Sequence, residues 1–256
     1  MTDVRKKHEK WDAVAQCMRG RGYYFNQPLS FYKRGEFLKI LAGYKGEYFS
    51  RVLKTDVFEE AYGREDIVRY LSARSKTVYC ADISHEIISD ARQKRYKNAA
   101  YVCQNINEFS FRSNTFDFVF SSSTLGYADS VSRAVGETYR VLIPGGRAVL
   151  SFNNKMNIGF RIMTCICMIF RIVPFSMSKS FTPRELERIL QERGFRIERT
   201  EPIVHVLPFQ QMLIHVLRKL RCEKGAVNLI TRYSNSTLRL KKYTAWFYAF
   251  CVVKEA

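Results

Sequence analysis

From residue 51 onward, short apolar segments alternate along the chain with amphipathic ones. The pattern predicts strands over residues 52–55, 77–83, 100–104, 116–121 and 148–152, separated by helices over 65–73, 86–95 and 130–142. Such alternation is typical of a parallel sheet with helices on both faces, because parallel neighbours need a crossover connection. We therefore expect an α/β protein whose ligands bind at the carboxyl ends of its strands.

The stretch from Asn105 to Arg147 adds a more specific pattern. An apolar strand, Phe116 to Phe120, ends in three serines, and a helix then leads into Pro144-Gly145-Gly146 and the next apolar strand. This succession resembles the second half of the class I S-adenosylmethionine-dependent methyltransferase domain. The resemblance implies a Rossmann-like sheet of seven strands, mostly parallel, with residues 246–254 as an antiparallel last strand. It also implies S-adenosylmethionine as the cofactor.

The chain divides into an N-terminal segment and one larger domain. Residues 1–44 interleave aromatic and basic side chains, and we expect them to form a helical cap. The methyltransferase-like domain then runs over residues 45–256. It carries an apolar insertion at about 155–180 and a basic amphipathic helix at about 209–222. The apolar insertion is too short to span a bilayer, which needs roughly 20 residues, and it suits a lid or a helix at a membrane surface.

The composition narrows the range of partners and compartments. A net charge of +18 favours polyanions, although a basic surface without any such partner is the alternative. The seven cysteines are scattered, and neither a CxxC pair nor a His-rich cluster predicts zinc, so we expect no metal site. The N-terminus lacks the apolar segment of a signal peptide. These features indicate a cytoplasmic protein, with peripheral contact with an anionic inner membrane face as an added option.

The resemblance assigns cofactor contacts to three strand ends. Asp82, followed by Ile83, should accept hydrogen bonds from the ribose hydroxyls; the alternative is an acid that stabilises the next helix N-terminus. Asn105 should accept from the adenine amine, or else serve a turn, and Ile106 should present its backbone N–H and its side chain to the ring. Ser121 would leave room beside the sulfonium, unless it only ends a strand.

The first loop departs from the family pattern. The usual V-L-D-x-G-x-G-x-G reads V-L-K-T-D-V-F-E-E-A-Y-G here, so that Gly63 is the glycine that remains. Asp56 takes the place of the leading acid. Glu60 could pair with the ammonium group of the cofactor, and Lys54 or Arg64 could compensate the acids. A domain that has lost its cofactor is the alternative reading of this loop.

Methyl transfer needs mainly alignment of a nucleophile with an activated methyl group, and a general base helps when the acceptor is a hydroxyl. His205, Tyr127 and Asp129 are the candidate bases, and the sequence does not choose among them. The apolar insertion and the positive charge favour a small-molecule acceptor, either lipid-linked or a glycan. A nucleic-acid methyltransferase, RNA being the substrate, is the second hypothesis, and a non-catalytic binding protein with this fold is the third. The oligomeric state stays open.

Overall fold

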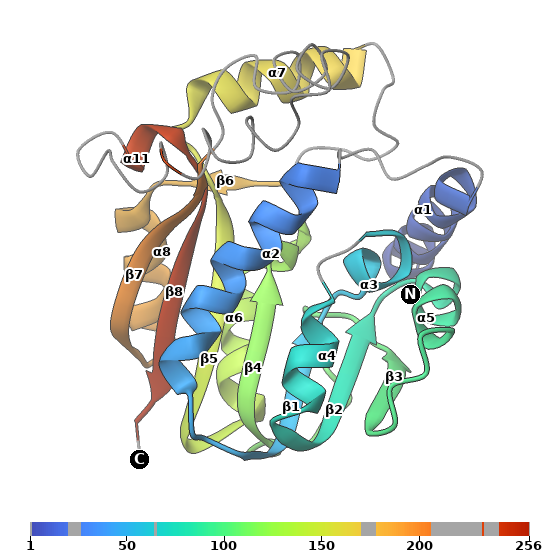
Figure 1. Cartoon of the computed structure of the whole chain (residues 1–256), viewed down its shortest axis with the longest axis vertical. Helices are drawn as coiled ribbons and strands as arrows, with labels where there is room; N and C mark the ends of the chain where they lie inside the picture. Colours follow the sequence, from blue (N-terminus) through green and yellow to red (C-terminus); the bar gives the residue numbers. More distant parts are fainter. Residues whose placement is uncertain are drawn as a thin grey trace.

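The structure is a computed structural model that describes residues 2–19, 27–63, 66–169, 178–205, 232 and 241–255. Its centre is a twisted sheet with the strand order β3-β2-β1-β4-β5-β8-β7, and the short β6 pairs with β5 (Figure 1). All pairs from β3 to β5 are parallel, whereas β8 is antiparallel to both β5 and β7. The predicted Rossmann-like fold with an antiparallel last strand is thus confirmed. The strands are β1 (Phe49–Thr55), β2 (Ser75–Asp82), β3 (Ala99–Cys103), β4 (Phe116–Ser122), β5 (Leu142–Asn154), β6 (Ser180–Phe181), β7 (Phe195–His205) and β8 (Ala245–Lys254).

Helices begin where the sequence supplies caps. The side chains of Ser84, Ser130 and Thr182 each accept a backbone N–H of the following helix, and Thr182 forms a capping box with Glu185. The predicted helices of the α/β region are confirmed to within two or three residues at each end. The described helices are α1 (Thr2–Arg19), α2 (Gln27–Leu41), α3 (Phe58–Tyr62), α4 (Ile67–Ser72), α5 (His85–Arg92), α6 (Val131–Val141), α7 (Ile158–Ile169), α8 (Pro183–Glu192) and α11 (Lys241–Thr244), with 3-10 turns at Ala42–Tyr44 and Thr124–Tyr127.

The hydrophobic core lies on both faces of the sheet. Successive side chains of a strand point to opposite faces, so Val52 of β1 joins one apolar cluster and its neighbour Leu53 joins the other. The first cluster lies under α1, α2, α4 and α5, and the second lies under α6 and α8. Figure 1 shows the same arrangement, with α2 and α4 in front of the sheet and α6 and α8 behind it.

The N-terminal helices contact the sheet in two different places. Phe37 of α2 is fully buried, and its ring contacts Phe120 of β4 and Phe247 of β8. The other helix, α1, lies beside α5 at the end of the sheet where β2 and β3 finish (Figure 1). Residues 27–44 therefore share a core with the strands, while α1 lies near their carboxyl ends.

Two predicted additions have different outcomes. The apolar insertion forms α7, which lies beyond the carboxyl ends of the strands (Figure 1). The basic helix predicted at about 209–222 lies outside the described residues. Within the described part of the chain, no helix has the length and apolar character needed to cross a membrane.

Candidate functional site

The acidic residues singled out from the sequence meet at one edge of the sheet. Thr55 of β1 pairs with Ala81 of β2 on one side and with Ser121 of β4 on the other. The residues that follow these strand ends therefore lie side by side, and Asp56 and Asp82 become neighbours. A hollow of about 410 Å³ lies at the opposite edge, lined by residues such as Phe49, and touches none of the predicted site residues.

Asp82 presents a buried carboxylate at the end of β2. The residue is 8% exposed, and its two oxygens accept the backbone N–H groups of Val57 and Ser84, each at 3.0 Å. A carboxylate has about four acceptor positions, so each oxygen keeps one position after these bonds. Burial, and then the nearby Asp56 carboxylate, raise the pKa of Asp82 to about 7. Two remaining acceptor positions suit a ligand that offers two neighbouring hydroxyl groups.

Asp56 lies in the turn that directly follows β1. Its φ of 70° is in the left-handed region, which Asp tolerates better than most residues. Its N–H donates to Ala81 O at 2.6 Å, and its Oδ1 accepts from Phe58 N at 2.7 Å. Burial is the main cause that raises the pKa of this carboxyl group. Such conformations cluster at functional sites, and this one brings a second acid beside Asp82.

The rest of the first loop uses its polar groups internally. Glu60 is fully buried, with Oε2 at 2.8 Å from Lys54 Nζ and Oε1 accepting Val68 N at 3.3 Å. Gly63 ends α3, and a Cβ there would lie only 2.0 Å from a carboxylate oxygen of Glu59. Lys54, one of the two cations that the sequence offers, thus pairs with Glu60, and Lys33 of α2 pairs with Glu59 at 3.1 Å.

The serines after β4 have distinct environments. The hydroxyl of Ser121 is fully buried and accepts from Thr55 Oγ1 at 2.7 Å, which ties β4 to β1. The Ser122 hydroxyl is buried and has no hydrogen-bond partner among the described residues. Because neighbouring side chains point to opposite faces, Ser122 rather than Ser121 offers an unused oxygen at this edge.

The predicted adenine contacts lie after β2 and β3. Asn105 Oδ1 accepts from both the backbone N–H and the side-chain amide of Asn107, at 3.0 Å each, so it serves a turn in this structure. Ile106 is half-buried against the second apolar cluster. The carbonyl of Ile83 accepts the thiol of Cys103 at 3.2 Å.

The three candidate bases have different environments. Burial, and then the charge of Asp56, raise the pKa of Tyr127, so that it stays a neutral phenol. Asp129 is exposed and forms an ion pair with Lys7 of α1. His205 is 2% exposed at the end of β7, and its Nδ1 lies 2.9 Å from Thr244 Oγ1. Tyr127 belongs to the 3-10 turn whose Thr124 Oγ1 donates to Asp56 Oδ2 at 3.3 Å, and His205 has a partner on α11.

Helix α1 covers this edge of the sheet, through contacts that no local sequence signal predicts. Asp12 accepts from Ser84 Oγ at 2.5 Å and from Glu86 N at 3.3 Å, at the start of α5. Trp11 contacts Tyr127 edge-on, with 5.2 Å between ring centroids. Together with the ion pair between Lys7 and Asp129, these contacts join α5 to the segment after β4. The interleaved aromatic residues of the N-terminus predict a cap, but not its partners.

Comparison with known proteins agrees with this geometry. The family described as "Methyltransferase domain" matches residues 58–150. The ubiquinone/menaquinone biosynthesis C-methyltransferase of Rickettsia typhi is 24% identical over 129 residues, which cover 45% of this chain and 52% of that protein. This chain spans only part of the curated relatives that it matches, from a fifth to about half of their own length.

Two solved structures share the fold. One holds the Trm112 methyltransferase activator of Haloferax volcanii in complex with a methyltransferase; the aligned chain has a TM-score of 0.66 and 15% identity, with 97% of both chains covered. The other is phosphoethanolamine N-methyltransferase 2 of Haemonchus contortus with S-adenosyl-L-methionine, with a TM-score of 0.59 and 19% identity, covering 87% of this chain and 53% of that one. At such identities the likeness shows the fold alone.

Proposed function

Residues 58–150 belong to a methyltransferase-domain family, and we propose on this premise that the chain is an S-adenosylmethionine-dependent methyltransferase. The observation that carries the proposal is the Asp82 carboxylate at the end of β2. It is buried, fixed by two backbone N–H groups and left with one acceptor position on each oxygen. A ribose supplies the two adjacent hydroxyl donors that such a carboxylate accepts.

The residues around Asp82 fit the rest of the cofactor. Ile83 and Ile106 supply apolar surface at the neighbouring strand ends for an adenine ring, and the unused Ser122 hydroxyl supplies a polar group after β4. When bound, S-adenosylmethionine supplies an already activated methyl group. The chain then has to hold the acceptor in line with that group and exclude water, and α1 supports the second task by covering the edge.

Tyr127 is the residue that we assign to the acceptor side. It is neutral, lies under Trp11 and is close enough to Asp56 for that charge to raise its pKa. A neutral phenol can donate a hydrogen bond that orients an acceptor oxygen or nitrogen.

We assign the acceptor to the small-molecule class, lipid-linked or a glycan, and the surface of α7 favours the lipid-linked form. Four isoleucines follow one another along this helix at a spacing of about one turn, and their side chains are 40% to 76% exposed: Ile158, Ile162, Ile166 and Ile169. The helix lies beyond the carboxyl ends of the strands (Figure 1). An exposed apolar stripe there can hold the chain of a lipid-linked acceptor near the site.

Two measurements test the function and its alternatives. Calorimetric titration of the full chain with S-adenosylhomocysteine should give one binding site, and a folded protein that shows no heat of binding would support the non-catalytic scaffold instead. Methyl transfer from labelled S-adenosylmethionine should then label a lipid or glycan fraction of a cell extract. Label that enters only the RNA fraction would overturn the assigned acceptor class and support the nucleic-acid alternative.

A further inference from the structure

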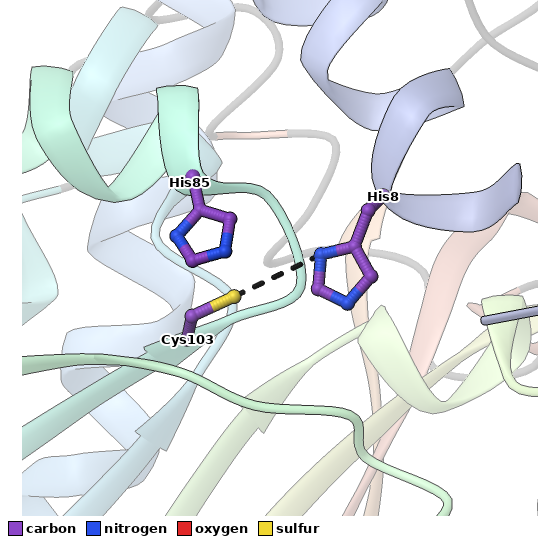
Figure 2. Close-up of side chains that lie close together, drawn as sticks. All are labelled: His8, His85 and Cys103. Carbon is purple, nitrogen blue, oxygen red and sulfur yellow. Dashed lines mark hydrogen bonds between the residues drawn. The ribbon is translucent and has the colours of Figure 1, made fainter. Parts of the chain in front are cut away.

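Three metal-binding side chains that lie far apart in the sequence meet beside Asp82. His8 comes from α1, His85 is the first residue of α5, and Cys103 ends β3 (Figure 2). The possible ligand atoms of the three residues all lie within 4.8 Å of one another, and Cys103 Sγ is 3.9 Å from His8 Nδ1. The two imidazole rings are nearly parallel, with centroids 5.7 Å apart. No local spacing in the sequence announces this group, because each ligand comes from a different element.

We propose that His8, His85 and Cys103 form a binding site for a single zinc ion, with water as the fourth ligand. One thiolate and two imidazoles are ligands that zinc prefers, and three protein ligands with an open fourth position are usual at non-structural zinc sites. Zinc bonds of about 2.0–2.3 Å in a tetrahedron place ligand atoms about 3.3–3.8 Å apart. The described atoms, which lie within 4.8 Å of one another, need to close by about 1.5 Å at most. Rotation of an exposed and a half-buried histidine can supply this movement.

The electrostatic surroundings favour a cation at this point. Asp82 is the register partner of Cys103, and Asp12 accepts hydrogen bonds from the residues on either side of His85, so two carboxylates lie beside the site. Without an ion, the Cys103 thiol donates a hydrogen bond to the carbonyl of Ile83. Binding breaks the S–H bond, forms a zinc–sulfur bond and releases one proton to solvent. The same two carboxylates then offset the charge of the ion, although the chain as a whole carries +18.

The site joins α1 to the sheet. His8 lies on α1, one turn before Asp12, while the other two ligands belong to α5 and β3. A bound ion would thus add a strong bond between α1 and the edge that holds Asp82, beyond the contacts of Asp12 with Ser84 and Glu86. We expect zinc to slow every motion that lifts α1 from α5.

Titration of the full chain with Co²⁺, followed by displacement with Zn²⁺, tests the site without cofactor or acceptor. We expect one equivalent of Co²⁺ to give the thiolate-to-cobalt charge-transfer band and four-coordinate visible absorption. Cys103→Ser should remove the charge-transfer band. His8→Ala and His85→Ala should each weaken Zn²⁺ binding by at least about 100-fold, as loss of a direct ligand costs at least as much as loss of its hydrogen-bond partner. Cys17→Ser is the matched control, because it removes a thiol from α1, the helix that carries His8. It should change neither the spectrum nor the affinity.

Hydrogen exchange of residues 2–19 gives an independent readout. Zn²⁺ should slow exchange in α1 of the wild type and leave the Cys103→Ser protein unaffected. The proposal is overturned if the wild type binds no Co²⁺ or Zn²⁺, or if Cys103→Ser binds them as tightly as the wild type with the same spectrum. Because neither measurement involves S-adenosylmethionine, a negative result here leaves the methyltransferase proposal intact, and failure to bind S-adenosylhomocysteine leaves the zinc site intact.

Discussion

Lowering the pH should weaken cofactor binding in a range where most carboxylates are already ionised. Burial and Asp56 raise the pKa of Asp82 to about 7. Ribose hydroxyls donate to the ionised carboxylate, so protonation removes a charged acceptor and opposes binding. We assume that only the ionised form of Asp82 binds. The affinity for S-adenosylhomocysteine then falls with the ionised fraction of Asp82, about 10-fold from pH 8 to pH 6 and about 100-fold from pH 8 to pH 5.

Asp56→Asn isolates the cause of this shift. Asn tolerates the left-handed backbone of position 56, but it removes the like charge that helps to raise the pKa of Asp82. The fall in affinity should therefore move to lower pH in this variant. Calorimetric titrations of the wild type and of Asp56→Asn with S-adenosylhomocysteine between pH 5 and pH 8 measure the effect. A wild-type affinity that stays constant over this range, or an Asp56→Asn profile that coincides with the wild type, would refute the reasoning.

Three further perturbations probe the loop, a helix cap and the cover. Lys54→Met should lower the free energy of unfolding by about 3–5 kcal/mol in denaturant titrations, because it leaves Glu60 charged and buried; adding Glu60→Gln should restore most of the loss, and no recovery would contradict the ion-pair account. Thr182→Ala should cost about 1 kcal/mol, seen as a lower Tm, since the capping box is lost; an unchanged Tm would show that the box does not stabilise α8. S-adenosylhomocysteine should change the tryptophan emission of the wild type but not of Trp11→Phe, which keeps Trp246; a change that persists in the variant would place the ligand away from α1.

Local patterns of the sequence predict the scaffold of this protein well. Apolar strands and capped helices depend on neighbours within a few residues, so the strand before Asp82 and the capping box of Thr182 were both predictable. The mostly parallel sheet with an antiparallel last strand followed from the resemblance, and the structure confirms it. The position of Asp82 at a strand end was equally local, and it follows directly from the length of β2.

Partners that are distant in the sequence were beyond prediction. The sequence offers Lys54 as one possible cation for the acids of the first loop, and only the fold shows that Lys54 and Val68 occupy both oxygens of Glu60. The choice between Ser121 and Ser122 depends on which face of β4 each one meets. The contact of Trp11 with Tyr127 spans more than a hundred residues. That contact depends on how α1 packs beside α5.

The central claim is that Asp82 holds a cofactor ribose at the carboxyl end of β2. Asp117 is a matched control, because its carboxylate also accepts two backbone N–H groups, those of Ser50 and Arg51 at 2.5 and 2.6 Å, at the other end of the sheet. Titration of Asp82→Ala and Asp117→Ala with S-adenosylhomocysteine at pH 8, both checked for folding by circular dichroism, compares the two directly. We predict that binding is lost in Asp82→Ala and kept in Asp117→Ala. Equal affinity in the two folded variants would contradict the account.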